Sequence, residues 1–368
     1  MKFNIPYLSG NETKYISEAI ESKQIAGDGT FTKKCQKWFE ERFNFRKTFL
    51  TTSCTDALEM AAILVDIKEG DEVILPSFTF VSTANAFLLR GAKLVFVDSQ
   101  EGNPNMDANS IEKLITPKTK VILVMHYAGM ACDMESILQL TEDNKIFVVE
   151  DAALALGSYY NGKPLGSFGH LAAFSFHETK NISCGEGGLL VINDEKLVKR
   201  AEIIREKGTN RSAFFRGEID KYGWTDIGSS FLPSDILAAY LWAQLESFDT
   251  IQKKRMQIWN YYHEQLMPLQ ISKKISLPDG SVKHNASIFY LICSSVDERT
   301  SLIDFCKKQN IPLTFHYQAL HKSAFINSST TLSNAERYSH TLVRLPLYPD
   351  LTESDVKQIA QTILKFYS

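Results

Sequence analysis

The sequence predicts an α/β fold, in which a seven-stranded, mainly parallel sheet builds a large domain and a small α+β domain follows it. Three observations support this prediction. Short apolar runs alternate with helical patterns between residues 48 and 193, which is typical of a parallel sheet covered by helices on both faces. The pattern then changes in the C-terminal part of the chain. The length of 368 residues suits two domains, at about 150 residues each.

The predicted elements of the sheet follow one another in a regular order. The first 45 residues have a mostly helical pattern, with turn residues at 27–29. Seven strands are expected at 48–52, 72–76, 93–98, 120–126, 146–151, 172–177 and 188–193. Helical patterns lie between the early strands, at 55–66, 83–90, 109–115 and 134–142. Strands that alternate with helices in this way indicate one sheet in one domain.

The rest of the chain is expected to complete the large domain and then to form the small one. The interval 195–225 is charged and aromatic, which is typical of an exposed excursion such as an interface segment. A long helix is expected at about 234–265, strands near 287–293 and 312–317, and a closing helix at 352–366. We therefore expect a large domain at residues 1–247 and a small domain at 248–368.

Composition excludes several classes of protein. The 40 Lys and Arg nearly balance 43 Asp and Glu, so the net charge of −3 provides no basic surface for a nucleic acid polymer. No apolar run approaches the roughly 20 residues of a membrane span, and the first residues lack the apolar stretch of a signal peptide. The six cysteines form no CxxC pair and no zinc-spaced cluster. We expect a cytoplasmic protein with reduced thiols and no metal site.

The carboxyl ends of the predicted strands are the first place to look for a site, because open parallel sheets bind ligands there. Polar residues follow five of these strands, at 52–55, 77–80, 126, 151 and 175–180. A GxGxxG fingerprint is absent, so a nicotinamide-binding domain fits poorly.

Lys180 and Asp151 carry the strongest chemical signal. Lys180 follows a buried strand and precedes a glycine cluster at 184–188 that lets backbone approach a ligand closely. A desolvated lysine can form a Schiff base, although most loop lysines are simply solvated. Asp151 ends a strand, where it can cap a helix or pair with a protonated pyridine nitrogen. That pairing stabilises the cation by about 4 kcal/mol at 4 Å with an effective dielectric of 20.

A phosphate-binding turn is the second signal. Cys54 and Thr55 open the first helix after a strand, and helix N-termini hold anions, although an ordinary N-cap is equally consistent with this segment. Ser175 can add a hydroxyl to the same phosphate. Phe80 can stack on a flat cofactor ring, although an aromatic residue after a strand more often belongs to the core. The order phosphate turn, aromatic, acid and Ser-x-x-x-x-Lys is the one expected of a fold-type I enzyme that uses pyridoxal 5'-phosphate (PLP).

The whole chain resembles the DegT-type sugar-nucleotide aminotransferases, which are fold-type I PLP enzymes. The motifs that carry the resemblance are GDGTFT (27–32), TSCTDALEMAA (52–62), GDEVILPSFTFVSTANAFLLRGAKLVFVD (70–98), HYAG (126–129), VVEDAA (148–153), SFHETKN (175–181), GEGG (185–188) and LPLYPDLT (345–352). Two further stretches, 202–224 and 228–246, most resemble the branch of the family that makes dTDP-4-amino-4,6-dideoxygalactose.

The resemblance implies a role for each matching residue. Lys180 matches the lysine that holds PLP and shuttles the proton, and Asp151 matches the acid that pairs with the pyridine nitrogen. The other positions expected to bind the cofactor are Cys54, Thr55, Phe80, Leu154, Ser175 and Ser230. The positions expected to bind the substrate are Asn181, His316, Tyr317 and His321.

Two positions depart from the family pattern. Relatives usually carry Gln or His three residues after the pyridine-pairing acid, near the phenolic oxygen of the cofactor. This chain has Leu154 there, which cannot donate a hydrogen bond, so ring positioning must differ. Many relatives carry Asn where this chain has Ser230, the residue that reaches the PLP phosphate of the partner subunit. The galactose-forming branch shares this serine.

The resemblance implies that glutamate donates an amino group to C4 of a dTDP-linked 4-keto-6-deoxyhexose, with a galacto product favoured for lipopolysaccharide or enterobacterial common antigen synthesis. A homodimer is expected, because the partner chain completes each site. Two alternatives stay open. A PLP-dependent sugar dehydratase is disfavoured, because such enzymes tend to replace the lysine with histidine. A family member that has lost catalysis and serves as a binding or regulatory subunit is supported only by Leu154.

Overall fold

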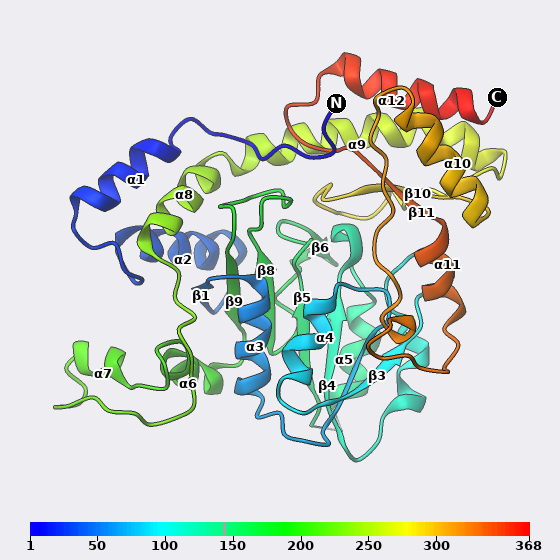
Figure 1. Ribbon diagram of the computed structural model, residues 1–368. Coiled ribbons are helices and arrows are strands. Elements are labelled where there is room, and N and C mark those ends of the chain that lie inside the picture. Colours follow the sequence, from blue (N-terminus) through cyan, green and yellow to red (C-terminus); the bar gives the residue numbers. More distant parts are fainter. Residues whose placement is uncertain (143–144) are drawn as a thin grey trace.

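A seven-stranded sheet forms the centre of the large domain in the computed structural model, which describes residues 1–142 and 145–368 (Figure 1). Its strands are β1 (Lys47–Thr51), β2 (Glu72–Pro76), β3 (Lys93–Val97), β4 (Thr119–Met125), β5 (Phe147–Asp151), β8 (Leu171–Ser175) and β9 (Gly188–Ile192). They are ordered β1-β9-β8-β5-β4-β2-β3. β9 pairs antiparallel with both neighbours and the other pairs are parallel. The predicted seven-stranded, mainly parallel sheet is confirmed.

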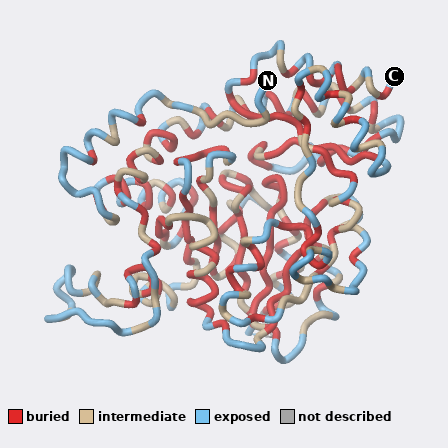
Figure 2. The backbone as a smooth tube through the Cα atoms, viewed as in Figure 1, coloured by how far each residue is buried: buried red, intermediate tan, exposed pale blue. Residues whose placement is uncertain are grey.

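Helices cover both faces of this sheet. One face packs against α3 (Cys54–Leu64), α4 (Val81–Leu88) and α6 (Glu195–Arg205). The other face packs against α2 (Thr30–Phe43), α5 (Met134–Glu142) and α8 (Asp235–Glu246). Successive side chains of a strand point to opposite faces, so Val73 and Leu75 contact the first group and Ile74 the second. Both faces are therefore buried, as Figure 2 shows, which explains the continuous apolar runs.

Shorter elements connect these layers. They are α1 (Glu12–Glu21), η1 (Ala108–Ser110), η2 (Glu112–Leu114), η3 (Tyr127–Gly129), β6 (Tyr159–Tyr160), β7 (Lys163–Pro164) and α7 (Arg211–Phe215). The helix expected at 109–115 is instead the two single 3-10 turns η1 and η2. The excursion expected at 195–225 leaves the body of the domain after α6, and its side chains Phe215 and Trp224 are 67% and 84% exposed.

The small domain combines helices with a two-stranded antiparallel sheet. Its elements are α9 (Phe248–Ile271), β10 (Phe289–Ile292), α10 (Val296–Lys307), η4 (Leu320–Lys322), α11 (Ser333–Thr341), β11 (Leu342–Leu345) and α12 (Glu353–Phe366). β10 pairs with β11, and α9, α10 and α12 bury their apolar sides in one cluster with these strands. The closing helix is confirmed.

Two further predicted elements are wrong. The long helix expected at 234–265 is two helices, α8 and α9, because Ser247 leaves helical geometry between them with ψ of 6°. A periodicity of 3.6 residues does not detect a break of one residue. The strand expected at 312–317 is absent, since only Thr314 in this segment forms a β-bridge, to Arg344. The second strand of the small sheet is β11. Its four residues are too few to be recognised as a strand from the sequence pattern alone.

Helix α9 contributes to the cores of both domains. Phe248 and Ile251, in its first turn, pack with α2 and α8 of the large domain. From Ile258 onward its buried side chains belong to the core of the small domain. The boundary between residues 247 and 248 therefore stays a prediction. Within the described part of the chain, no helix is both long enough and apolar enough to cross a membrane.

Candidate active site

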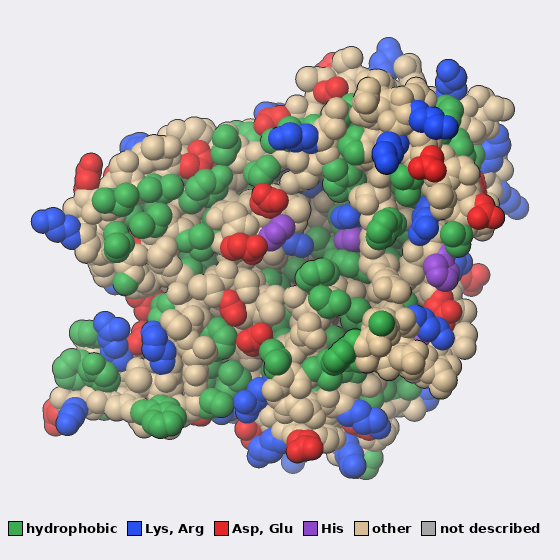
Figure 3. Space-filling model, viewed as in Figure 1, with side chains coloured by type: hydrophobic (Ala, Val, Ile, Leu, Met, Phe, Trp, Pro, Cys, Tyr) green, Lys and Arg blue, Asp and Glu red, His purple; other side chains and the backbone are tan. Residues whose placement is uncertain are grey.

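A cavity of about 680 Å³ lies between the carboxyl ends of the sheet strands and the small domain. Figure 3 shows the molecule hollowed between these parts, with histidine and basic side chains gathered at the hollow. The residues singled out from the sequence that line the cavity are Cys54, Thr55, Phe80, Asp151, Leu154, Ser175, Lys180, Asn181, His316 and Tyr317. Side chains from both domains thus meet at one place.

Asp151 is the last residue of β5 and is buried at the bottom of the cavity. Thr83 Oγ1 donates to its Oδ2 at 2.7 Å, and the backbone N–H of Ala153 donates to its Oδ1 at 3.2 Å. Burial raises the pKa of Asp151, while the Thr83 hydroxyl and the charge of Lys180 act in the opposite direction. A cationic N–H brought against this carboxylate would favour its ionised form.

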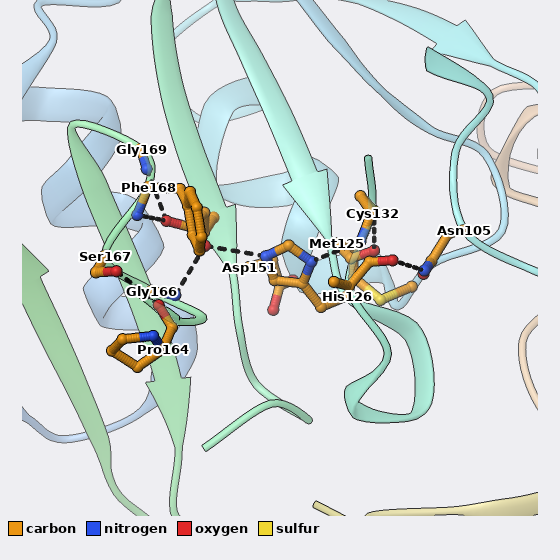
Figure 4. Close-up of polar contacts among 12 residues, drawn as sticks. Asn105, Met125, His126, Cys132, Asp151, Pro164, Gly166, Ser167, Phe168 and Gly169 are labelled. Atoms are coloured by element: carbon orange, nitrogen blue, oxygen red, sulfur yellow. Dashed lines mark hydrogen bonds and ion pairs between the residues drawn. The ribbon is translucent and has the colours of Figure 1, made fainter. Parts of the chain in front are cut away.

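A buried polar network fixes the end of β5 from behind (Figure 4). Glu150 accepts backbone N–H bonds from Gly166, Phe168 and Gly169 at 2.7 to 2.8 Å. His126 Nε2 lies 3.0 Å from Glu150 Oε2, and its Nδ1 accepts from the backbone N–H of Cys132 at 3.2 Å. Since Nδ1 accepts, Nε2 carries the proton that bonds Glu150. The network holds the strand end without using the Asp151 side chain.

Lys180 lies in the turn that follows β8, facing the cavity. Its backbone N–H donates to the carbonyl of His177 at 2.9 Å, which closes the turn. Burial lowers the pKa of Lys180, and the nearby charge of Arg344 lowers it further, while Cys54 and Asp151 raise it. A lowered pKa increases the neutral, nucleophilic fraction of the amine.

The N-terminus of α3 forms the third feature of the cavity. Ser53 Oγ caps the helix by accepting the backbone N–H of Asp56 at 3.0 Å. The N–H groups of Cys54 and Thr55 belong to the first turn, so the helix itself gives them no acceptor. The cap therefore leaves two donors and the positive end of the helix dipole for an anion.

The elements beside the N-terminus of α3 pack closely against it. Thr55 Oγ1 donates to Ser82 Oγ at 2.9 Å, which places two hydroxyls side by side at the cavity. Ser175 ends β8 and adds a third hydroxyl. A Cβ at Gly188 would lie 2.3 Å from the backbone oxygen of Ser53, so only glycine allows β9 to pass here. The donor set fits a phosphate group.

The small domain supplies the opposite side of the cavity. Tyr127 OH lies 2.8 Å from His316 Nδ1, and the ring of His316 stacks on Tyr317 with 3.6 Å between centroids. Phe80, the N-cap residue of α4, lies 6.1 Å from Tyr317 between ring centroids and is 55% exposed. Phe80 therefore does not belong to the core and is free to stack on a planar group.

Asn181 and Leu154 line the floor between the domains. Asn181 Nδ2 donates to Gln252 Oε1 at 2.9 Å and to the carbonyl of Asn285 at 2.7 Å. Its Oδ1 is buried with no donor in the described part of the chain. The Leu154 side chain is almost fully buried, and its carbonyl accepts from Asn285 Nδ2 at 2.9 Å. Asn181 thus offers an acceptor that a ligand can use.

Two residues singled out from the sequence lie away from this cavity. His321 is buried in η4, where Nδ1 contacts Ser77 Oγ at 2.6 Å and Nε2 contacts Glu336 Oε1 at 3.1 Å. These contacts join η4 to the loop after β2 and to α11. His321 therefore stabilises the segments that border the cavity and does not line it. Ser230 is exposed beside α6 and forms a β-bridge with Glu206.

Sequence reasoning missed several residues of the cavity, among them Thr83, Arg255, Asn285 and Arg344. Thr83 lies inside a helix, where its contact with Asp151 depends on the packing of α4. Arg344 interrupts the apolar run of β11, and a charge inside a buried run is a signal that could have been used. Arg255 and Asn285 carry no comparable signal. Among the residues described, no group of His, Cys, Asp and Glu could hold a metal ion.

Comparisons with known proteins agree with this geometry. The family model of the DegT/DnrJ/EryC1/StrS aminotransferases matches residues 6–364. GDP-perosamine synthase of Escherichia coli O157:H7 is 31% identical, over 99% of this chain and 97% of that protein. Spr1654 of Streptococcus pneumoniae, solved in PMP and PLP forms, superposes with TM-scores of 0.92 and 0.91 at 25% identity, over 100% of this chain and 98% of each.

PseC of Helicobacter pylori, an aminotransferase involved in the biosynthesis of pseudoaminic acid, superposes with a TM-score of 0.90 at 25% identity, over 100% of this chain and 98% of its own. A phosphorylated pyridine cofactor needs an anionic partner for its ring nitrogen, an amine and a phosphate site, and the buried acid, the desolvated lysine and the capped helix N-terminus are groups of these three kinds. The chain therefore belongs to the DegT/DnrJ/EryC1/StrS aminotransferase family and has the fold-type I architecture of PLP-dependent enzymes.

Proposed function

We propose that this protein moves the amino group of glutamate to C4 of a nucleotide-linked 4-keto-6-deoxyhexose. The observation that carries the proposal is the convergence of Lys180, Asp151 and the N-terminus of α3 on one cavity. The cofactor is PLP, which when bound acts as an electron sink at the carbon that exchanges its proton. The chain supplies the binding, the orientation and the proton transfers.

Each residue of the large domain has a defined task in this proposal. Asp151 binds the pyridine nitrogen, and the hydrogen bond from Thr83 holds the orientation of its carboxylate. The N–H groups of Cys54 and Thr55, with the hydroxyls of Thr55 and Ser175, bind the phosphate. Phe80 covers the face of the ring. Lys180 Nζ would hold the cofactor and, in each half-reaction, move one proton between the cofactor and the reacting carbon of the donor or of the sugar.

The small domain binds the substrate in this proposal. His316 and Tyr317 contact the sugar nucleotide, and burial keeps His316 neutral by lowering its pKa well below the usual value. A neutral imidazole can accept or donate a hydrogen bond without adding charge. Asn181 Oδ1 accepts from a ligand hydroxyl. His321 supports the wall through Ser77, and does not contact the substrate directly.

We also propose a homodimer in which the partner chain completes each site. Ser230 is exposed and does not line the cavity of its own chain, as expected of a residue that reaches the phosphate of the partner. The excursion around α7 carries exposed aromatic side chains that a second copy would cover.

We also propose a cytoplasmic location. The six cysteines are free, which is consistent with the cytoplasm, where thiols stay reduced.

The nucleotide has two candidates. Stretches 202–224 and 228–246 favour a dTDP sugar with a galacto product, for lipopolysaccharide or common antigen synthesis. The names of two relatives, GDP-perosamine synthases of Escherichia coli and Vibrio cholerae at 31% and 28% identity, favour a GDP sugar instead. A dehydratase is disfavoured by Lys180. Loss of catalysis rests only on Leu154, since Asp151 and Lys180 are both retained.

Product NMR tests the proposal. The protein, loaded with PLP, is incubated with glutamate and either dTDP-4-keto-6-deoxyglucose or GDP-4-keto-6-deoxymannose. A 4-amino sugar in one reaction identifies the nucleotide, and the coupling constants of H4 report the face that was protonated. Absence of amine in both reactions, with the PLP absorption band unchanged by glutamate, would refute an aminotransferase.

A variant at Leu154 separates impaired catalysis from a changed environment of the cofactor. Leu154→Gln restores a donor near the phenolic oxygen. We expect the PLP absorption band to shift and turnover to change by less than about tenfold, the effect of one hydrogen bond. A rise from no turnover to clear turnover would instead show that leucine disables the enzyme.

A further inference from the structure

Two threonine hydroxyls form a relay of hydrogen bonds that ends on Asp151. Thr83 Oγ1 donates to Asp151 Oδ2 at 2.7 Å, and Thr79 Oγ1 lies 2.8 Å from Thr83 Oγ1. Thr79 is 1% exposed and Thr83 is fully buried. Within the part of the chain that the structure describes, Thr83 is the only hydrogen-bond partner of the Thr79 hydroxyl. Thr79 therefore contacts the carboxylate only through Thr83.

The direction of the relay follows from the number of protons. A hydroxyl group has one proton to donate and two lone pairs that accept. Since the Thr83 hydroxyl donates its proton to Asp151, it accepts in its contact with Thr79, and Thr79 is the donor. Hydrogen bonds in series polarise one another, so the donation from Thr79 strengthens the bond that reaches Asp151.

The relay favours the ionised form of Asp151. A neutral Asp151 could donate to Thr83, and Thr83 to Thr79, but each of these bonds would join two neutral groups. Hydrogen bonds to a carboxylate are roughly twice as strong as those between neutral groups. Burial raises the pKa of Asp151, and the bond from Thr83 acts against burial. The charge of this buried carboxyl group therefore depends on the hydroxyls behind it.

Thr79 lies in a loop that the small domain holds in place. The loop, residues 77–80, joins β2 to α4. The backbone N–H of Leu320 donates to the carbonyl of Ser77 at 2.8 Å, and His321 Nδ1 lies 2.6 Å from Ser77 Oγ. These bonds fix the loop two residues before Thr79. The geometry of the relay is thus set by the surrounding structure.

We propose that Thr79 is a positioning residue for Asp151, which directs the Thr83 hydroxyl to the carboxylate and so keeps Asp151 ionised opposite the ring nitrogen of PLP. The proposal rests on the proposed function for the contact between Asp151 and that nitrogen. A purely structural role, in which the Thr79 hydroxyl only supports the start of α4, is the alternative that an experiment must exclude.

Binding of two cofactors that differ at one ring position tests this proposal. Titration of the cofactor-free protein would measure its affinity for PLP and for an analogue in which a C–H group replaces the ring nitrogen. The analogue offers Asp151 no N–H, so a structural defect should weaken both ligands equally. We expect Thr79→Val, which removes the hydroxyl and keeps the shape, to weaken PLP binding about threefold and to leave the analogue unaffected. Thr79→Ser keeps the hydroxyl and should bind PLP like the wild type.

A double-mutant cycle tests whether Thr79 acts through Thr83. Thr83→Val removes a hydrogen bond to a charged group, so PLP binding should weaken at least about tenfold. Adding Thr79→Val to this variant should have no further effect, because the relay is already interrupted. The control Thr48→Val removes a buried hydroxyl that donates to Glu40 Oε1 at 3.3 Å outside the cavity, and should bind both ligands normally.

Three results would overturn the proposal. They are unchanged PLP binding in Thr79→Val, equal weakening of PLP and of the analogue, and effects of the two valines that add in the double variant. If Thr79→Val fails to fold, Thr79→Ala removes the same hydroxyl, and the same three results decide.

The titrations also separate this proposal from the proposed function. A preference of the wild type for PLP over the analogue that Thr79→Val does not reduce would keep the role of Asp151 and refute that of Thr79. A preference that depends on Thr79, in a protein that aminates no keto sugar, would keep the relay and refute the function. Equal affinity of the wild type for both ligands would refute the roles of Asp151 and Thr79 together.

Discussion

The two walls of the cavity differ in how their side chains are held. The large-domain wall (Cys54, Thr55, Asp151, Ser175 and Lys180) stands at strand ends and at one helix N-terminus. The small-domain wall (Asn285, Ser287, His316, Tyr317 and Arg344) comes mostly from irregular segments and one short strand. Regular elements give fixed positions to groups that must meet one cofactor. Irregular segments can differ among relatives that bind different sugars, since loops tolerate change.

Of the variants that test this difference between the walls, Lys180→Ala should have the largest effect on turnover. It removes the amine of the large-domain wall that the proposed mechanism uses in both half-reactions, so turnover should be abolished while the fold and cofactor binding persist. Steady-state amination and circular dichroism would measure both. Residual turnover above a tenth of wild type would contradict the assigned role. Lys113→Ala, at an exposed lysine outside the cavity, is the matched control.

Asp151→Asn should have the next largest effect. The amide keeps the shape of the carboxylate and loses the charge, which is worth up to about 4 kcal/mol, so kcat should fall roughly 100- to 1,000-fold with either substrate. Absorption spectra would show how much cofactor is retained. A loss confined to the sugar half-reaction would mean that Asp151 acts on the substrate instead. Asp304→Asn, at an exposed site outside the cavity, should behave as wild type.

Tyr127→Phe probes the small-domain wall. It removes the hydroxyl that lies 2.8 Å from His316 Nδ1, a hydrogen bond worth about 1 kcal/mol. We expect KM for the keto sugar to rise about fivefold, with the glutamate half-reaction unchanged. Steady-state kinetics in both directions would check this. An equal loss in both half-reactions would show that the two walls do not divide the work.

The pH dependence of stability gives the smallest effect. Burial lowers the pKa of Lys180 in the folded, cofactor-free protein, whereas the unfolded chain has a value of about 10.4. Between these values the unfolded state binds more protons, so this contribution to stability rises with pH. The Tm advantage of Lys180→Met over wild type should therefore shrink between pH 7 and pH 10. A constant difference, as expected for Lys113→Met, would contradict the lowered pKa.

The large-domain wall could be predicted because its residues sit where periodic patterns end. The expected strand at 72–76 coincides with β2, and the one at 146–151 ends with β5 at Asp151. Since parallel strands end at a common edge, the sequence also implied that Asp151 and Lys180 would lie near each other. Local pattern and overall topology agree there.

The small-domain wall could not be predicted in the same way. His316 and His321 stand five residues apart in one motif, yet the first lines the cavity and the second turns inward to Ser77. The 3-10 turn η4, which contains His321, decides this, and no periodicity reports it. Arg344 reaches the cavity only because β11 pairs with β10, a contact between distant parts of the chain.

Helix α9 has a practical consequence for anyone who exchanges parts between relatives. Its first turn is a component of one hydrophobic core and its remainder of the other. A fragment cut at residue 247 would take Phe248 and Ile251 away from the large domain and leave apolar surface open on both pieces. A chimera that changes substrate preference should therefore keep the native α9 through residue 257 and join the foreign sequence after it. The helix then fixes the distance between the cofactor-binding residues of the native large domain and the substrate-binding residues of the foreign small domain.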